Sequence, residues 1–382
     1  MNNSFTHFDL RMVSPPFESK ATDLIIDLDY LRKNVPRGTT PSEIFFQLKD
    51  IFHMLESIGS ARIEGNRTTY LEYVESKIDP QNSVPESYKE IRNMESALSF
   101  IDAHIQDYPT ITRVFLSELH KIVVKDLTTE GSRNPGDYRT TAIKIAGAAL
   151  ITPDSVQVPA YMEELFNFIA QSTLPKYDLI KTALAHHRFA WIHPFDNGNG
   201  RTVRLLTYAM LVKQGFRVQL ADRILNPTAI FCCDRKIYYD SLARADRGDD
   251  QGLLDWCTYV FEGLKREITK VDRLSNYKYV ASHILIPAFN YSFERRLITE
   301  YEHKILKLAA EKNELTNSGI KKIFPDKNIS VISNMIRKLK EKGMILPQKE
   351  NGRKYKIRFD NNYLLRGIIE ALARNDFLPL DD

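Results

Sequence analysis

Apolar residues recur at intervals of three and four along most of the chain, which is typical of helices that bury one face. The clearest case is residues 41–64, where Ile44, Leu48 and Ile51 would share a buried face. The same spacing predicts further helices over residues 86–107, 111–127, 159–171, 177–192, 200–214, 229–246 and 250–274. We therefore predict a mainly α-helical fold, with one large domain over residues 41–280.

Two segments break the helical spacing. Residues 1–40 contain Pro15-Pro16 and Pro36, and we expect an extended arm with a short helix there. Residues 131–157 mix glycine, proline and β-branched residues, a pattern that predicts a short β-hairpin.

The pattern changes again near a domain boundary that we place between residues 278 and 296. Beyond it, the spacing predicts helices at 299–310, 316–324 and 329–342, and short strands at 345–346 and 355–357. Asn351-Gly352 between the strands is a strong hairpin turn signal. This order resembles a winged helix-turn-helix over residues 296–360, followed by a C-terminal helix and tail over 361–382.

Charge is distributed unevenly. Residues 321–358 hold twelve Lys or Arg against three acidic residues, a net charge of +9, so the rest of the chain carries −5 if the whole is +4. The predicted helix 329–342 exposes Asn334, Arg337 and Lys338, which suits a recognition helix in a DNA groove. Protein contact, including homodimerisation, and a merely solvated face are the alternatives.

Composition narrows the setting. The chain has 382 residues, enough for more than one domain. Its three cysteines are an odd number and imply no disulfide framework, so we expect a reducing cytoplasm. No apolar stretch approaches the length that spans a bilayer, and we expect no membrane partner.

The sequence His193-Pro-Phe-Asp-Asn-Gly-Asn-Gly-Arg201, followed by Arg204, joins two of the predicted helices. The first backbone N–H groups of a helix lack intrahelical partners and favour anions. Gly198 and Gly200 let that backbone approach a ligand closely. Arg201 and Arg204 lie three residues apart, so both guanidiniums can reach one phosphate chain. The motif therefore predicts a phosphate site beside a histidine.

The motif resembles the signature of the Fic (Fido) family, His-Pro-Phe-x-Asp/Glu-Gly-Asn-Gly-Arg-x-x-Arg, and the resemblance covers roughly residues 40–275. It implies a helical bundle with a β-hairpin flap, and a protein adenylyltransferase that moves AMP from ATP to a Ser, Thr or Tyr hydroxyl of a target protein or of itself. It also implies Mg²⁺ as a cofactor. The flap, over about 143–156, would add a strand of the target to its edge; a purely structural hairpin is the alternative.

The resemblance assigns roles to individual residues. His193 would be the general base, and nucleotide contacts would come from Gly198, Asn199, Gly200, Arg201, Thr202, Val203, Arg204 and Tyr239. Tyr239 would stack near the adenine, although an ordinary core tyrosine explains it nearly as well. The family's metal-holding acid is replaced by Asn197, whose neutral amide should hold Mg²⁺ less tightly.

A second family pattern is found in Ser60-Ala-Arg-Ile-Glu64-Gly65. In relatives it ends an inhibitory helix, and its Glu pairs with the second motif arginine. Here that implies autoinhibition in cis by a Glu64–Arg204 pair, with Ser60 in support. The alternative is that this segment is an ordinary helix C-terminus capped by Gly65.

Two interpretations follow. The first is an autoinhibited, Mg-ATP-dependent adenylyltransferase that the winged helix directs to its target. The second is a nucleotide-binding, DNA-associated regulator in which Asn197 has weakened or abolished transfer.

Overall fold

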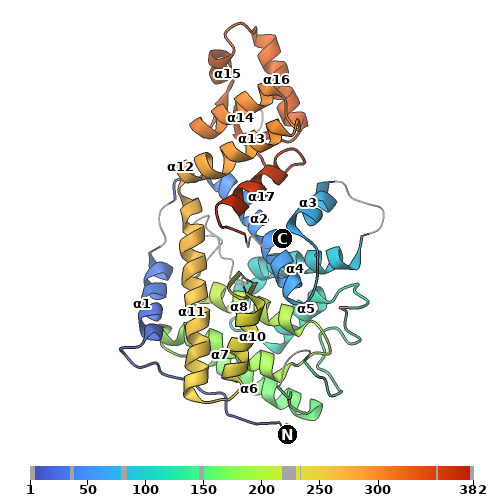
Figure 1. The fold of residues 1–382 in the computed structure, drawn as a ribbon, viewed down its shortest axis with the longest axis vertical. Coiled ribbons are helices and arrows are strands. Elements are labelled where there is room, and N and C mark those ends of the chain that lie inside the picture. Colours follow the sequence, from blue (N-terminus) through green and yellow to red (C-terminus); the bar gives the residue numbers. More distant parts are fainter. Residues whose placement is uncertain are drawn as a thin grey trace. The chain divides into compact units, whose positions relative to one another are not determined.

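The structure, a computed structural model, describes residues 5–34, 38–78, 84–145, 150–216, 229–232, 234–349 and 352–378. The chain folds into two compact units (Figure 1). Unit 1 comprises residues 1–35, 56–68 and 83–269, and unit 2 comprises residues 36–55, 69–82 and 270–382. Unit 2 thus takes in segments on the N-terminal side of the predicted boundary near residue 280.

Unit 1 is helical throughout its regular parts. Its elements are the last part of α2 (Ser42–Ile63), α1 (Lys20–Lys33), α4 (Glu86–His104), α5 (Arg113–Val123), α6 (Val158–Ala170), α7 (Asp178–Ile192), α8 (Asn199–Lys213), α9 (Ala229–Cys232), α10 (Arg235–Ala245) and most of α11 (Asp250–Asp272). These agree with the predicted mainly α fold, and α1 is the short helix predicted within residues 1–40.

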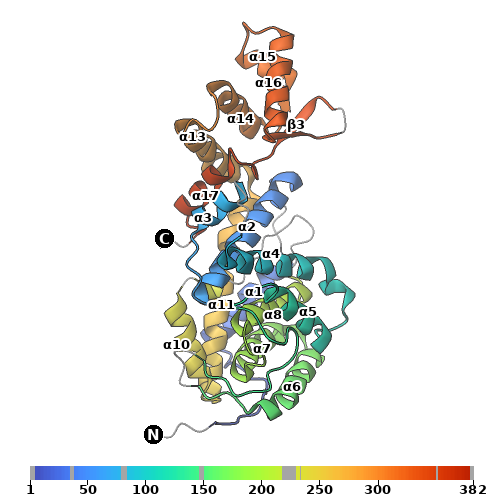
Figure 2. The ribbon, with the colours of Figure 1, turned by 90° about the vertical axis from the view of Figure 1, so that its right-hand side faces the viewer.

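The centre of unit 1 is formed by α7 and α8, which pack against each other. α6 packs on α7, while α4 and α5 pack on α8 (Figure 2). Apolar side chains from all of these helices form one cluster, in which Trp191 and Trp256 are almost fully buried. The indole of Trp256 donates a hydrogen bond of 2.7 Å to the carbonyl of Ala183, which joins α11 to α7. The packing places the ends of α7 and α8, and hence the motif between them, against α4 and α5.

The predicted helix 229–246 is divided into α9 and α10. Asp234 adopts an extended backbone and its carboxylate accepts the backbone N–H of Ile237 at 2.9 Å, so it caps a new helix. A side-chain cap of this kind competes with continuation of the preceding helix, and apolar spacing does not detect it.

The segment predicted as a β-hairpin, 131–157, has no regular strand among its described residues, and residues 146–149 at its tip lie outside the description. Its limbs lie side by side, since the hydroxyl of Thr152 donates to the carbonyl of Ile143 at 3.4 Å. The buried guanidinium of Arg139 fixes the base of the segment by donating to the carbonyls of Pro153 and His193 at 2.6 and 2.9 Å. The limbs are thereby attached to the motif loop.

Unit 2 contains a small antiparallel sheet in the order β1-β3-β2, with Leu315 opposite Tyr355 and Ile345 opposite Ile357. Its elements are the first part of α2, α3 (Tyr70–Ile78), α12 (Tyr277–Tyr279), α13 (Ile286–Glu294), α14 (Glu300–Lys312), β1 (Leu315–Thr316), α15 (Asn317–Ile323), α16 (Ile329–Glu341), β2 (Ile345–Pro347), β3 (Lys354–Ile357) and α17 (Leu365–Arg374). From α14 to β3 the three helices and the last two strands follow the order predicted for a winged helix-turn-helix, and β1 is an additional strand that was not predicted.

Side-chain caps define this part of the chain. Thr299 and Glu302 form a reciprocal capping box at the start of α14, and Asn328 caps α16 by accepting the N–H of Val331 at 3.0 Å.

The predicted boundary region 278–296 is largely helical. Within it α12, a π-helical segment over residues 280–285 and α13 follow one another. Among the described helices, none combines the length and apolar character that crossing a bilayer requires.

Candidate active site

His193 lies at the C-terminal end of α7, in a left-handed backbone conformation with φ 53°. A non-glycine residue rarely adopts this conformation without compensating contacts. Here the contacts are its own N–H on the carbonyl of Phe189 at 2.9 Å and its carbonyl on the guanidinium of Arg139 at the same distance. The backbone around the histidine is thus held firmly while the imidazole stays partly exposed.

The imidazole of His193 is oriented by its own helix. Its Nδ1 lies 3.3 Å from the carbonyl of Ala190, an acceptor, so Nδ1 carries the proton and Nε2 is left with a lone pair. Burial lowers the pKa of His193 to about 4, against a smaller opposing effect of that carbonyl and of Glu64. A neutral imidazole with a bare Nε2 is the state that a general base needs.

The loop after His193 is closed by side chains of the motif itself. The amide of Asn199 accepts the N–H of Phe195 at 2.9 Å and donates to its carbonyl at 2.8 Å. Gly198, the N-cap of α8, has φ 72°, and its carbonyl accepts both the N–H and the hydroxyl of Thr202. Asn199 therefore contributes only its backbone to an anion site.

At the start of α8, where the sequence predicts an anion cradle, a carboxylate lies against the helix. The N–H groups of residues 199–201 belong to the first turn and have no acceptor within the helix. A Cβ on Gly200 would lie 2.1 Å from Oε1 of Glu64, so that carboxylate is in direct contact with the glycine. Glu64 stands where the sequence predicted a phosphate.

Glu64 is fixed by the second motif arginine, as predicted. Arg204 donates to Oε1 of Glu64 at 2.8 Å, and it also donates to the hydroxyl and the carbonyl of Ser60 at 2.8 and 2.9 Å. Despite burial, the charge of Arg204 lowers the pKa of Glu64, so the carboxylate is ionised at neutral pH. The Glu64–Arg204 pair joins the end of α2 to α8.

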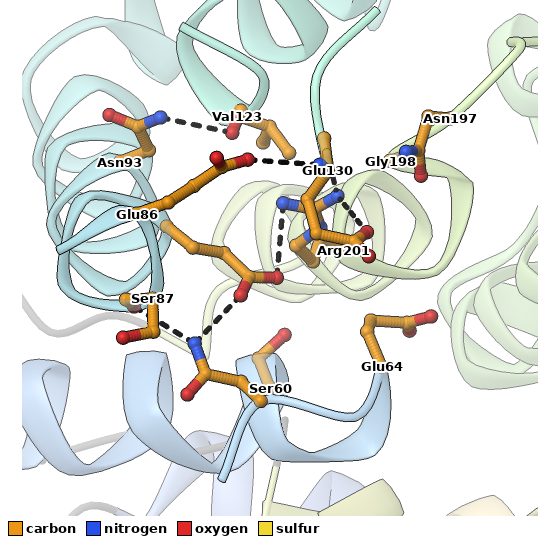
Figure 3. A network of polar contacts seen from close by, with 12 residues as sticks. Ser60, Glu64, Glu86, Ser87, Asn93, Val123, Glu130, Asn197, Gly198 and Arg201 are labelled. Carbon is orange, nitrogen blue, oxygen red and sulfur yellow. Dashed lines mark hydrogen bonds and ion pairs between the residues drawn. The ribbon is translucent and has the colours of Figure 1, made fainter. Parts of the chain in front are cut away.

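The first motif arginine faces different carboxylates. Arg201 is 1% exposed, and its Nη1 lies 3.1 Å from Oε1 of Glu90 on α4. Its Nη2 donates to the backbone carbonyl of Glu130 at 3.0 Å and contacts the Glu130 carboxylate at 3.3 Å (Figure 3). The sequence predicted that both arginines reach one phosphate chain; in this structure each is engaged by separate acidic residues.

The remaining predicted contacts lie in different surroundings. Thr202 and Val203 are buried within α8, and their side chains face the interior of unit 1. Tyr239 on α10 is 38% exposed, and burial together with the charge of Glu64 raises the pKa of its phenol. Tyr239 therefore borders the cradle, whereas its neighbour Tyr238 is buried and hydrogen bonded to His186 at 2.9 Å.

Asn197 offers little to a metal. Its amide oxygen accepts the N–H of Gly198 at 2.7 Å and its amide nitrogen donates to the carbonyl of Thr129 at 3.3 Å. The adjacent Asp196 accepts the N–H groups of Arg133 and Asn197, both at 3.0 Å. In the part of the chain that the structure describes, no group of three His, Cys, Asp or Glu residues could hold a metal ion.

His120 supports the motif loop and was not recognised in the sequence. Its ring stacks on Phe195 with centroids 3.7 Å apart, Nδ1 accepts the N–H of Gly136 at 2.8 Å, and Nε2 donates to the carbonyl of Asn197 at 3.0 Å. Burial lowers its pKa to about 4, so it stays neutral and keeps both bonds. Like Glu90, Glu130 and Arg139, it is distant in sequence from the motif it contacts.

The comparisons with known proteins agree with this geometry. The model of the Fic/DOC family matches residues 110–211, which run from α5 through the motif and along α8. The chain carries a Fic/DOC domain. Its fold is also that of solved Fic proteins: a Fic family protein from Desulfovibrio desulfuricans has a TM-score of 0.53 at 18% identity, covering 92% of this chain and 98% of that one. Fic-1 from C. elegans has a TM-score of 0.54 at 21% identity, covering 66% and 71%.

Curated relatives of the Fic domain carry one name. A protein adenylyltransferase Fic from Nematostella vectensis is 29% identical over 231 residues, which are 56% of this chain and 48% of that protein. A protein of the same name from Drosophila yakuba is 30% identical over 212 residues, or 54% and 38%. The chain thus spans about half, or less, of the length of these relatives.

Proposed function

We propose that the protein is an autoinhibited adenylyltransferase that transfers AMP from ATP to a hydroxyl group of a protein. The observation that carries the proposal is the position of the Glu64 carboxylate, which contacts Gly200 and Arg204 and affects the pKa of His193. A carboxylate held there marks an anion site beside a neutral imidazole. The names of the curated relatives support the same activity.

Buried donors in the cradle support phosphate as the ligand. Within the described residues, Arg201 Nε and Arg204 Nη1 are buried without a hydrogen-bond acceptor. Such donors are costly unless a ligand satisfies them. The phosphate chain of ATP would supply acceptors to these guanidiniums and to the N–H groups of residues 199–201, which together stabilise the charge that develops in phosphoryl chemistry.

His193 would remove the proton in the transfer step. Nε2 takes the proton of the target hydroxyl as its oxygen forms a bond to the α-phosphorus, and the bond from that phosphorus to the bridging oxygen breaks. Pyrophosphate leaves with the electron pair, and Arg204 and the cradle hold its charge. The target is a Ser, Thr or Tyr of another protein or of the chain itself, and the limbs of the 131–157 segment would guide it. The buried thiol of Cys257, which forms no disulfide, is compatible with the proposed cytoplasmic location.

Glu64 would act as an inhibitor in cis. While it occupies the guanidinium of Arg204, a γ-phosphate cannot, because two anions compete for one cation. Intact mass spectrometry of a Glu64→Gly variant after incubation with ATP and Mg²⁺ tests the activity. A gain of one AMP supports transfer, whereas a gain of one phosphate would replace the proposal with phosphotransfer.

Mg²⁺ would be held chiefly by phosphate oxygens and water, because Asn197 supplies only one neutral oxygen that already accepts a backbone bond. When bound, the ion would neutralise phosphate charge. In a Glu64→Gly background, Asn197→Asp is expected to lower the Mg²⁺ concentration for half-maximal transfer by about tenfold, since a carboxylate is a stronger Mg²⁺ ligand than an amide. A titration of initial rate against Mg²⁺ measures this; an unchanged midpoint would remove residue 197 from the metal site.

Gly200 is expected to be essential for nucleotide binding. In the Glu64→Gly background, Gly200→Ala should weaken ATP binding by about tenfold, because its methyl group fills the space that the Glu64 carboxylate, and by inference a phosphate, occupies. Calorimetric titration with ATP measures the effect. Gly319→Ala on α15 is the control, because this glycine has no positive φ and its nearest neighbour is the Thr316 hydroxyl at 3.3 Å. Equal losses in both variants would count against the assigned cradle.

DNA binding by α16 is a second candidate function, proposed from the charge of residues 321–358. Asn334, Arg337 and Lys338 are exposed on α16, and within the described residues no carboxylate pairs with Lys338 or Lys340. Unpaired cations on an exposed helix suit a phosphate backbone.

Full-length protein is expected to bind duplex DNA with an affinity that falls as salt rises, and Lys338→Ala with Lys340→Ala should weaken it by about tenfold. Fluorescence anisotropy at several salt concentrations measures both effects. The matched control is Lys236→Ala on α10, an exposed lysine paired with Asp240. Affinity independent of salt, or equal loss in the control, would leave α16 as a protein-contacting helix.

A further inference from the structure

Arg201, the first arginine of the motif, is held by a carboxylate that also holds the segment bearing Glu64. Glu90 on α4 is 3% exposed, and its Oε1 lies 3.1 Å from Nη1 of Arg201. Its other oxygen, Oε2, accepts the side-chain amide of Asn66 at 2.7 Å. Asn66 follows Glu64 by two residues. One buried carboxylate therefore bridges the nucleotide cradle and the end of the inhibitory segment.

Asn66 is the residue that closes the turn after Glu64. Its backbone N–H bonds to the carbonyl of Ala61 at 3.1 Å, its side-chain oxygen accepts the N–H of Thr68 at 2.9 Å, and its amide nitrogen also donates to the carbonyl of Ser87 at 2.8 Å. The turn is thus attached to α4 through Asn66. The position of Glu64 depends on that attachment, because only one residue separates the two.

The two arms of this bridge use different oxygens of one carboxyl group. Arg201 faces Oε1 of Glu90 as an ion-pair partner, and the Asn66 amide donates a hydrogen bond to Oε2. Glutamine has the same shape, but it would turn its NH₂ group toward one of the two donors. A Glu90→Gln variant therefore breaks one arm of the bridge without leaving a cavity.

A neighbouring carboxylate on the same helix face offers a matched control. Glu86 lies one helical turn before Glu90, and it accepts backbone N–H groups of Thr128, Thr129 and Glu130. Its hydrogen bond with the Thr128 side chain and those backbone bonds lower its pKa to about 2. Glu86 fixes the loop that approaches Arg201 from the other side (Figure 3), and within the described residues its hydrogen bonds go to residues 128–130 and not to Asn66.

We propose that Glu90 is a positioning residue that couples Arg201 to Glu64. A phosphate that engages Arg201 competes with Glu90, which loosens the hold of Glu90 on Asn66 and releases Glu64 from Arg204. The coupling is reciprocal, so loosening the Asn66 turn favours nucleotide. This inference rests on the proposed function for the meaning of nucleotide binding, but the bridge itself can be tested without any nucleotide.

The first test is hydrogen exchange of the nucleotide-free protein. Glu90→Gln is expected to speed amide exchange at residues 64–66 by about tenfold, because the turn loses its anchor and opens locally. Glu86→Gln should speed exchange at 128–130 and leave 64–66 unchanged. Unchanged exchange at 64–66 in the Glu90→Gln variant would overturn the proposal.

The second test is a mutant cycle on ATP binding, with His193→Ala in every protein so that nucleotide is not consumed. Asn66→Ala is expected to tighten ATP binding by about fivefold when Glu64 is present and to have no effect when Glu64 is glycine, since contacting groups give non-additive effects. A purely structural role would change the affinity equally in both backgrounds, and that result would overturn the coupling.

The two tests separate the inference from the proposed function. If Glu90→Gln alters exchange at 64–66 but no variant binds ATP, the bridge stands and the proposed function fails. If Glu64→Gly binds ATP and modifies protein while Asn66→Ala acts equally in both backgrounds, the function stands and the coupling fails.

Discussion

Replacing Glu64 by glycine is expected to raise the rate of AMP transfer by about 100-fold, in line with the catalytic effect of freeing one cationic group at a phosphate. In the structure, Nη2 of Arg204 donates to Glu64 and to the carbonyl of Ser60, and Nε donates to the hydroxyl of Ser60. Removing the carboxylate leaves both Ser60 bonds, one of them from Nη2, and frees the second N–H of Nη2. The guanidinium therefore keeps its position while gaining capacity for an anion. Glycine also clears the space next to Gly200.

The rate is measured by intact mass spectrometry over time, since the chain itself is the simplest substrate. Glu64→Gln is the companion variant: it removes the charge but keeps the volume, and an intermediate rate is expected. Arg62→Gly, two residues earlier and within α2, controls for loosening of that helix. If the Glu64 variants bind ATP tightly yet remain unmodified, the Glu64–Arg204 pair does not limit transfer. That result would favour the interpretation of the protein as a nucleotide-binding regulator.

His193→Ala in the Glu64→Gly background is expected to reduce transfer by about a thousandfold, the usual effect of losing a general base. ATP affinity should change by less than about twofold, because the cradle is built from α8 and the arginines rather than from the imidazole. Single-turnover rates and calorimetric affinity distinguish the two effects. A parallel loss of ATP binding would make His193 a binding residue instead.

The pH profile gives an independent check on His193. Its pKa is lowered to about 4, so the imidazole stays neutral and able to accept a proton throughout the neutral range. We expect kcat/KM to be flat between about pH 6 and 8 and to fall only on acidification toward that pKa. The Glu64 charge raises the pKa of His193, so its removal shifts the profile further to acid, not to neutral pH. A fall in rate below about pH 6.5 would indicate an unperturbed histidine.

Much of unit 1 could be predicted from the sequence because its signals are local. Apolar spacing located α7 and α8, and the motif between them placed His193, Gly198 and Gly200 in a loop that leads into a helix. The pairing of Glu64 with Arg204 was implied by a second motif, and the structure contains that pair at 2.8 Å.

What the sequence did not indicate depends on contacts between distant segments. Glu90 and Glu130 reach Arg201 from other elements, and no spacing near the motif points to them. A weak signal existed, because Glu86, Glu90 and Asn93 follow one another at helical spacing on one face of α4. Polar residues at this spacing are, however, also typical of a solvent-exposed helix face. Their common role appears only when α4 is packed beside α8.

Other differences have local physical causes. Asn199 was predicted as a cradle residue; its side-chain amide satisfies the backbone of Phe195, a role that the sequence did not indicate. The helix over 229–246 is interrupted because Asp234 caps a new one. The residues of β1 are too few for a period of two to be visible, and they pair only because β3 lies beside them.

The Glu64 carboxylate is tethered to the site it occupies by its own polypeptide. Its effective concentration at Arg204 is therefore fixed by the geometry of α2 and does not change with the amount of protein in the cell. In the proposed function, ATP competes with a carboxylate whose effective concentration is constant. The fraction of molecules open to nucleotide therefore depends on ATP concentration and on the stability of one ion pair. The basal rate of AMP transfer per molecule would then follow the cellular ATP concentration and would not change on dilution of the protein. A partner that weakens the hold of α2 on Glu64 would raise this rate without a new binding site for nucleotide.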